Sequence, residues 1–234
     1  MSQRYFITGT DTEIGKTTIA AGLLHAARLR GLSTAAVKPV AAGCESTDDG
    51  LRNDDALTLQ AECMPALDYA LLNPVALEPV IAPHIAAAEA GLELTAGQLA
   101  RACLRVFERG ADITLVEGAG GWRVPLNDKQ TLADLAIELA QPVIMVVGLR
   151  LGCINHALLT AEAIAADGLQ LAGWVANQVE PQMDRQQHNL ETLRTLMPAP
   201  LLGVVPRLEP LTIAGVAEHL QLDVLLDRTS GLSP

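Results

Sequence analysis

The sequence predicts an α/β fold, in which a mostly parallel central sheet carries helices on both of its faces. Short apolar runs alternate along the chain with amphipathic stretches of helical period, as they do in such sheets. A glycine-bearing turn ending in Gly15-Lys16-Thr17 lies between the first apolar run and the first helical stretch. Strand, turn and helix in this order form a phosphate-binding loop. We therefore expect a fold of the P-loop NTPase type.

The elements follow from these runs in chain order. The expected strands cover residues 5–8, 34–38, 113–116, 143–147, 171–176 and 201–205. The expected helices cover residues 19–30, 51–62, 94–109, 132–139, 154–166 and 185–197. No internal repeat and no low-complexity linker divides the chain, so residues 1–226 are expected to form a single domain. Residues 227–234 are expected to form a flexible tail.

The composition disfavours several classes of protein. The formal charge of the 234 residues is −11, whereas nucleic-acid binders usually present a basic face. No uninterrupted apolar run is long enough to span a membrane, and the N-terminus lacks the pattern of a signal peptide. The cysteines form no CxxC pair, which disfavours zinc and redox motifs. We expect a cytoplasmic protein that binds neither nucleic acid nor membranes.

The phosphate-binding loop predicts a site for a nucleoside triphosphate. Successive backbone N–H groups would wrap the phosphates at the start of the following helix. Lys16 would reach the β- and γ-phosphates, and the Thr17 hydroxyl would ligate Mg²⁺. In the usual spacing the first glycine would stand at position 10, which is Thr10 in this chain. Gly9 lies one residue earlier. The alternative, a tight turn with an exposed lysine, leaves the surrounding run of Thr, Asp and Glu unexplained.

Polar side chains also follow two neighbouring strands at their carboxyl ends, where open α/β sheets bind ligands. Glu117 ends an apolar run and could hold Mg²⁺, while the glycine-rich residues 118–121 would let the backbone approach a ligand closely. Lys38 ends the second strand, where it could neutralise charge on a transferred group or simply extend into solvent. A second Mg²⁺ ligand could come from any of four crowded aspartates: Asp48, Asp49, Asp54 and Asp55.

Two later segments have the character of ligand-binding turns. Residues 148–156 join an apolar strand to a helix, whose free N–H groups could hold a carboxylate or a phosphate. Asn155 could instead cap that helix. Asn177 ends another strand and Pro206 follows the last one, so both could border a nucleobase. Asn177 offers the donor and the acceptor that adenine requires.

Together these segments are similar to those of the dethiobiotin synthetase family, whose members close a cyclic urea in biotin biosynthesis. The resemblance extends in order to about residue 208, through residues 8–17, 38–43, 51–56, 83–84, 116–121, 148–156, 173–177 and 198–203. It accounts for the displaced glycine, because Gly-Thr-Asp-Thr-Glu-x-Gly-Lys-Thr is the loop variant of that family. It implies a P-loop, ATP-dependent synthetase domain over residues 1–226.

The resemblance implies a ligase reaction. One amine of 7,8-diaminopelargonate takes up CO₂ to form a carbamate, ATP phosphorylates the carbamate, and the second amine expels phosphate. Catalytic roles are implied for Lys38 at the carbamate, for Lys16 at the ATP phosphates and for Thr12 beside both. Mg²⁺ would be held by Thr17, Asp55 and Glu117. The implied nucleotide contacts are Glu13, Ile14, Gly15, Lys16, Thr17, Thr18, Asp55, Glu117, Gly118, Ala119, Gly120, Asn177, Gln178, Pro206, Arg207 and Leu208.

The family is homodimeric, with active sites at the subunit interface. The implied substrate contacts are Lys38, Ala42, Gly152, Cys153, Ile154 and Asn155, the last four reaching the distal carboxylate from the opposite subunit. Two residues depart from the family pattern. Ala42 stands where the family often has serine, and Gln178 stands where an acidic residue is common.

Three other classes share the nucleotide loop. An amidating synthase of cobalamin assembly would carry a further glutaminase domain, for which the chain is too short. A partition-type ATPase switch would carry an additional lysine early in the loop, and none precedes Gly15 here. A small-molecule kinase would stop at a phosphorylated product and would show no dependence on CO₂.

Overall fold

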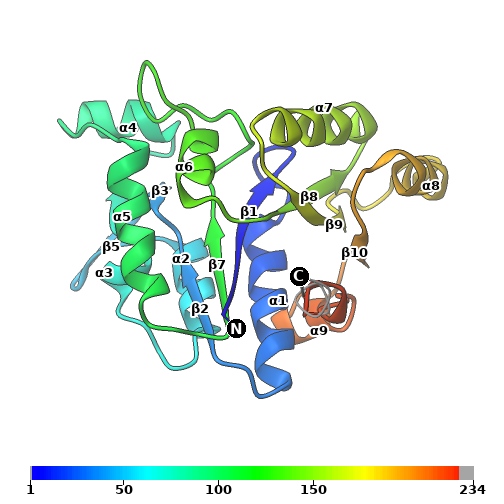
Figure 1. Cartoon of the computed structure of the whole chain (residues 1–234), viewed down its shortest axis with the longest axis horizontal. Coiled ribbons are helices and arrows are strands. Elements are labelled where there is room, and N and C mark those ends of the chain that lie inside the picture. The colour runs from blue at the N-terminus through cyan, green and yellow to red at the C-terminus, as the bar shows by residue number, and fades with distance from the viewer. Residues whose placement is uncertain (1, 227–234) are drawn as a thin grey trace, which may run out of the picture.

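The computed structural model describes residues 2–226, in which a six-stranded sheet forms the centre of the molecule (Figure 1). Its strand order is β10-β9-β8-β1-β7-β2, and all neighbouring strands are parallel. The bounds are β1 Gln3–Gly9, β2 Thr34–Val37, β7 Ile113–Glu117, β8 Val143–Leu149, β9 Leu171–Gln178 and β10 Leu201–Val205. All six predicted strands are present, and the predicted fold class is confirmed. The expected tail at residues 227–234 lies outside the described residues.

Helices cover both faces of this sheet. One face packs against α1 Lys16–Leu29, α2 Asp54–Ala61, α3 Tyr69–Leu72, α9 Ile213–Ala217 and α10 Asp223–Leu226. The other face packs against α5 Ala96–Phe107, α6 Leu132–Leu139, α7 Cys153–Ala166 and α8 Gln186–Leu196. In β1, Phe6 enters one core while Tyr5 and Ile7 enter the other. Because both faces are buried, the strands read as continuous apolar runs.

Short elements between residues 40 and 89 escaped prediction. β3 Val40–Ala42 pairs in parallel with β6 Val75–Leu77, and α4 Pro83–Glu89 follows. β4 Glu45–Thr47 and β5 Gly50–Arg52 form an antiparallel hairpin. The predicted helix over 51–62 is therefore wrong at its start, because residues 51 and 52 belong to this hairpin.

The real start of α2 is set by Asn53. The Asn53 side chain accepts a hydrogen bond from the Ala56 N–H, which caps the helix. The cap places Asp54 and Asp55 in the first turn of α2. Carboxylates are favourable there because they face the positive end of the helix dipole.

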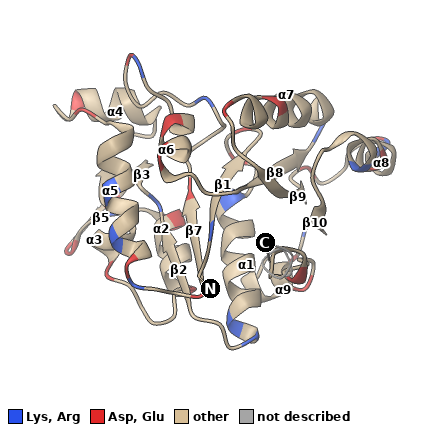
Figure 2. Cartoon of the chain, viewed as in Figure 1, with Lys and Arg blue, Asp and Glu red and all other residues tan. Residues whose placement is uncertain are grey.

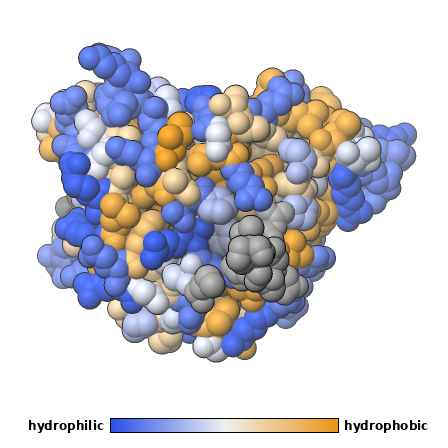
Figure 3. Space-filling view, in the orientation of Figure 1, coloured by the Kyte–Doolittle hydropathy of each residue, from blue (hydrophilic) through white to orange (hydrophobic). Residues whose placement is uncertain are grey.

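In the described part of the chain no helix is long and apolar enough to cross a bilayer. Charged residues lie mainly on the outer helices and the loops, and few fall on the central strands (Figure 2). On the face drawn in Figure 3, apolar residues alternate with hydrophilic ones and gather most over α7. Leu151, just before α7, is 91% exposed, and Leu159 within it is 56% exposed.

Candidate active site

The strand order brings three predicted segments to one place. β1 lies between β8 and β7, and β2 pairs with the outer side of β7. The phosphate-binding loop follows β1, Glu117 ends β7, and Lys38 directly follows β2. Parallel strands end at the same edge of a sheet, so these residues meet although the chain separates them widely.

The loop itself is shaped by its glycines. A Cβ atom on Gly9 would lie 2.7 Å from Ile14 Cδ1 and 3.0 Å from Lys16 Cδ, so a side chain at this position would displace Ile14 and Lys16. Gly15 has a φ of 82°, and its Cα faces the Asn177 amide. Because Gly15 takes this left-handed conformation, α1 begins at Lys16, three residues before its predicted start.

Lys16 folds over the loop that carries it. Its Nζ donates to the Asp11 carbonyl oxygen at 2.8 Å. Burial lowers the pKa of Lys16 to about 8, although the Glu117 carboxylate opposes this shift. Anionic phosphates would favour the charged form again, so this lysine is suited to a phosphate ligand. The Asp11 carboxylate forms an ion pair with Arg150, which sequence reasoning did not identify.

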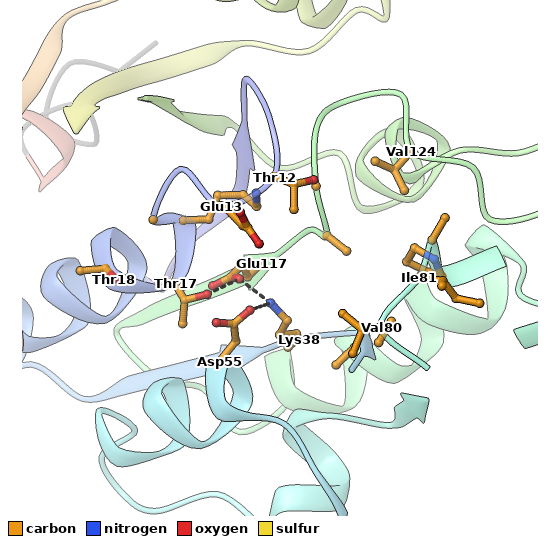
Figure 4. A pocket seen from close by; sticks show the side chains of 18 residues that line it. Thr12, Glu13, Thr17, Thr18, Lys38, Asp55, Val80, Ile81, Glu117 and Val124 are labelled. Carbon is orange, nitrogen blue, oxygen red and sulfur yellow. Dashed lines mark hydrogen bonds and ion pairs between the residues drawn. The ribbon is translucent and has the colours of Figure 1, made fainter. Parts of the chain in front are cut away.

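Four side chains meet at the centre of the site (Figure 4). Lys38 Nζ donates to Asp55 Oδ2 at 2.7 Å and to Glu117 Oε1 at 2.6 Å. The Thr17 hydroxyl donates to the same Glu117 oxygen at 2.8 Å. Lys38 is 5% exposed and Glu117 is 1% exposed, so their ion pair is shielded from water, whereas the Asp55 side chain is 50% exposed. The interpretation of Lys38 as a solvent-exposed surface lysine is therefore wrong.

Lys38 and Asp55 each favour the charged form of the other. Burial would lower the pKa of Lys38, but the Glu117 and Asp55 carboxylates outweigh it and raise the pKa above its usual value. Burial would likewise raise the pKa of Asp55, but Lys38 outweighs it and lowers the pKa. Both groups therefore stay charged at neutral pH. Asp54 is exposed, so the structure places Asp55, and not its neighbour, at the site.

The oxygen atoms of the cluster fit Mg²⁺. Glu117 Oε2 is buried and makes no hydrogen bond in the described part of the chain, which is costly unless a ligand reaches it. Thr17 and Asp55 add a hydroxyl and a carboxylate, and Mg²⁺ prefers such hard oxygen ligands. The described residues hold no group of three His, Cys, Asp or Glu side chains that could bind a metal. One or two carboxylates with substrate phosphates suffice for Mg²⁺.

A cavity of about 690 Å³ opens over this cluster. Twelve of its lining residues were predicted from the sequence: Thr12, Glu13, Gly15, Lys16, Thr17, Thr18, Lys38, Ala42, Asp55, Glu117, Ala119 and Gly120. Ile14 and Gly118 do not line it. Ile14 is buried beneath the loop, and Gly118 packs against the Phe6 ring.

A second cavity of about 320 Å³ adjoins the first, with Glu13, Gly15 and Thr18 lining both. The predicted residues in this second cavity are Asn177, Gln178, Pro206, Arg207 and Leu208. Asn177 Nδ2 donates to the Ile14 carbonyl oxygen at 2.8 Å, so part of its amide already supports the loop. Sequence reasoning missed Val179, Val205 and Leu211, whose apolar side chains complete the wall.

The start of α7 lies apart from both cavities. Gly152 is the N-cap with a φ of 94°, and no side chain caps the helix. The alternative in which Asn155 is the cap is therefore wrong, because Asn155 lies inside the first turn and is exposed. Cys153 is buried and Ile154 is half-buried. Within one chain, these four predicted substrate contacts do not join the central cluster.

An apolar wall of the first cavity was also missed. It consists of Ala41, Val80, Ile81, Ala82, Pro83 and Val124. Val80, Ile81 and Val124 lie across the cavity from the charged cluster in Figure 4. The signal available in the sequence was the apolar pair Val80-Ile81 between Pro79 and Pro83. In the structure Val80 is 89% exposed.

Comparisons with known proteins agree with this geometry. A family model described as an AAA domain matches residues 3–215. The chain is 65% identical over 218 residues to the ATP-dependent dethiobiotin synthetase BioD of Pseudomonas aeruginosa (strain UCBPP-PA14), covering 93% of this chain and 96% of that protein. It is 59% identical over 223 residues to the protein of the same name from Cellvibrio japonicus (strain Ueda107), covering 95% and 97%.

A solved structure supports the fold. The septum site-determining protein MinD from Pyrococcus horikoshii OT3, complexed with Mg-ADP, aligns over 99% of this chain and 98% of its own with a TM-score of 0.61. The two sequences are 15% identical, so this likeness concerns the fold alone.

Proposed function

Since the chain belongs to the dethiobiotin synthetase family, we propose that it makes dethiobiotin from 7,8-diaminopelargonate, CO₂ and Mg-ATP, releasing ADP and phosphate. The observation that carries this proposal is the cluster of Lys38, Asp55, Glu117 and Thr17 in one cavity with Lys16. It joins a phosphate-binding loop, a set of oxygen ligands and a second buried cation. Each of the three stabilises negative charge when phosphate is transferred to an anion.

The proposed chemistry has three steps. One amine of the substrate attacks CO₂ and loses a proton, which gives a carbamate. A carbamate oxygen then attacks the γ-phosphorus of ATP, and ADP leaves. The second amine attacks the activated carbonyl carbon and loses a proton, phosphate leaves with the C–O bond electrons, and the five-membered urea closes. Mg²⁺, when bound, would neutralise charge on the phosphates.

Each step needs a group that the site supplies. Lys38 would bind the carbamate, whose negative charge otherwise repels the γ-phosphate. Lys16 would bridge the β- and γ-phosphates, and Thr12 lies beside Gly120, where substrate and nucleotide would meet. Thr17, Asp55 and Glu117 would hold Mg²⁺. The cavity at Asn177, Gln178 and residues 206–208 would take the adenine, because it continues directly from the phosphate-binding loop.

The reaction is tested by turnover of Mg-ATP with 7,8-diaminopelargonate, in the presence and absence of bicarbonate. Product mass and ADP release are followed together. We expect dethiobiotin and ADP in equal amounts, and only when a source of CO₂ is present. A phosphorylated substrate formed without bicarbonate would contradict the proposal and would favour a kinase. ADP release without any new product would also contradict it and would favour a nucleotide-dependent switch.

The start of α7 supports a second proposal, that the active site is completed by another copy of the chain. Asn155 is exposed, and no side chain caps the helix that opens at Gly152. The Cys153 N–H donates to the Arg150 carbonyl oxygen at 3.0 Å, which leaves the next N–H groups of the first turn for a ligand. Leu151 beside them is 91% exposed, as a residue at an interface would be in an isolated chain. The helix start of one subunit would then hold the distal carboxylate of the substrate bound to its partner.

Mixing two inactive variants tests this arrangement. In a hybrid of Lys16→Met and Asn155→Ala chains, one of the two sites combines an intact loop with an intact helix start. Coexpression at equal levels should therefore restore about a quarter of the wild-type turnover, because half of randomly paired dimers are hybrids with one working site. Each variant expressed alone is the control. Absence of recovery at every mixing ratio would indicate that each subunit holds a complete site.

The location in the cell is proposed to be the cytoplasm. Cys44, Cys63, Cys103 and Cys153 are all unpaired and buried, as is usual in a reducing compartment. Cell fractionation with an antibody against the protein tests this, and recovery from a secreted or membrane fraction would contradict it.

A further inference from the structure

A buried hydrogen-bond network lies behind the charged cluster, and no step proposed above uses it. The Asn53 N–H donates to Tyr69 Oη at 2.8 Å, and Tyr69 Oη donates to Asn73 Oδ1 at 3.1 Å. Asn73 Nδ2 in turn donates to the Lys38 carbonyl oxygen at 2.7 Å. The exposed fractions are 8% for Asn53, 8% for Tyr69 and 4% for Asn73.

One end of this network holds Lys38. The residue lies between the end of β2 at Val37 and the start of β3 at Val40, so neither strand supports its backbone. Its N–H donates to the Leu72 carbonyl oxygen at 2.8 Å, and its carbonyl accepts from Asn73. The carboxyl end of α3 therefore satisfies both backbone groups of Lys38. A residue held at both groups has little freedom to move its side chain away from the cluster.

The other end of the network holds Asp55. Asn53 caps α2, and Asp55 is the second residue of that helix. The Asn53 N–H that meets Tyr69 therefore fixes the point from which α2 starts. The two ends converge again where Lys38 Nζ meets Asp55 Oδ2.

The Tyr69 hydroxyl links the two ends of the network behind the cluster. This hydroxyl accepts one hydrogen bond and donates another, a combination that a phenol offers and a phenyl ring does not. Burial raises the pKa of Tyr69, so the hydroxyl keeps the proton that it donates to Asn73. The Arg52 guanidinium lies over the Tyr69 ring, 4.3 Å from its centroid.

We propose that Tyr69 is a positioning residue, whose hydroxyl sets the spacing between the Lys38 ammonium and the Asp55 carboxylate. This role rests on the function proposed above. The Tyr69 hydroxyl would keep the Asp55 carboxylate directed at the Mg²⁺ position while the Lys38 ammonium binds the carbamate. Outer partners of this kind commonly change metal affinity or activity by about 10- to 100-fold when they are removed.

The chain offers a matched control for a test by Tyr69→Phe. Tyr5 is the other tyrosine; it is 6% exposed, and its hydroxyl bonds to Gln3 Oε1 at 2.7 Å and to the Leu225 carbonyl at 3.1 Å. It lies towards the amino end of β1, whereas the active site follows the carboxyl end. Tyr5→Phe removes the same atom from a buried, hydrogen-bonded site without touching the cluster.

The experiment measures the affinity for ADP by calorimetry with and without Mg²⁺, together with kcat, the Mg²⁺ concentration for half-maximal turnover and the Tm. For Tyr69→Phe we expect an unchanged affinity for metal-free ADP. The factor by which Mg²⁺ raises the affinity for ADP should be about tenfold smaller than in wild type. The Mg²⁺ requirement should rise by about the same factor, and kcat should fall. Tyr5→Phe should lower only the Tm.

Two further results decide the remaining cases. If Tyr69→Phe lowers the Tm as Tyr5→Phe does and leaves kcat and both Mg²⁺ measurements unchanged, the hydroxyl is merely structural and the proposal is wrong. If Tyr69→Phe does not fold, Asn73→Ala, which keeps the phenol and frees the Lys38 carbonyl, should show the fall in kcat. An unchanged kcat in that variant would equally overturn the proposal. The binding measurements need no substrate, so failure of the wild-type chain to form dethiobiotin would concern the proposed function alone.

Discussion

Replacing Lys16 with methionine is expected to reduce kcat by at least about 10³-fold, the upper part of the range for removing one preorganised electrostatic group. Lys16 is buried, and burial lowers its pKa to about 8, so the charged form is disfavoured while the loop is empty. Triphosphate oxygens would raise this pKa and favour the charged form. Methionine fills the same volume and supplies no charge, so transfer of the γ-phosphate loses its main side-chain counterion.

The measurement is steady-state turnover, with ADP binding and Tm determined separately. Lys129 is the only lysine of the sequence outside the site and is exposed, so Lys129→Met provides a matched control that should keep full activity. Turnover of Lys16→Met within tenfold of wild type would refute the assignment of residues 9–17 as the phosphate-binding loop. A large fall in Tm for Lys16→Met alone would instead indicate a structural role.

The sheet and the main helices were predictable because the chain repeats one pattern. Strands buried on both faces appear as continuous apolar runs, and α6 Leu132–Leu139 has the predicted bounds because a Thr131–Asp134 capping box marks its start. The segments that escaped prediction are three to seven residues long, as in β3, β6, α3 and α4. Elements this short show no period, and tertiary contacts decide their conformation.

The site was predictable as a list of positions but not as a set of contacts. The rule that ligands bind at the carboxyl ends of parallel strands located Glu117 and Lys38 without any structure. The choice of Asp55 among four aspartates depends on the cap at Asn53, which fixes where α2 begins. The network through Tyr69 joins Asn53 to Tyr69, which are 16 positions apart, and Asn73 to Lys38, which are 35 positions apart. No local sequence pattern encodes such contacts.

Replacing Lys38 with methionine should separate catalysis from nucleotide binding. Its ammonium neutralises Asp55 and Glu117 in the absence of metal and would face the carbamate during the reaction. We expect kcat to fall by about 10²-fold or more, by analogy with removing a single preorganised charge. The affinity for Mg-ADP should be kept, because Lys16 and the loop N–H groups remain, and the two carboxylates lose a competing cation.

Stability provides an independent measurement on the same Lys38→Met variant. Removing one partner of a buried ion pair leaves a buried charge uncompensated and costs about 3 kcal/mol, and Glu117 is only 1% exposed. The Tm without metal should therefore fall, and Mg²⁺ should restore it, because an ion that binds only the folded chain stabilises it. Wild type, whose cluster already contains a cation, should gain less from Mg²⁺. If Mg-ADP affinity instead falls as far as turnover, Lys38 serves the nucleotide. If Mg²⁺ fails to restore the Tm, Asp55 and Glu117 are not its ligands.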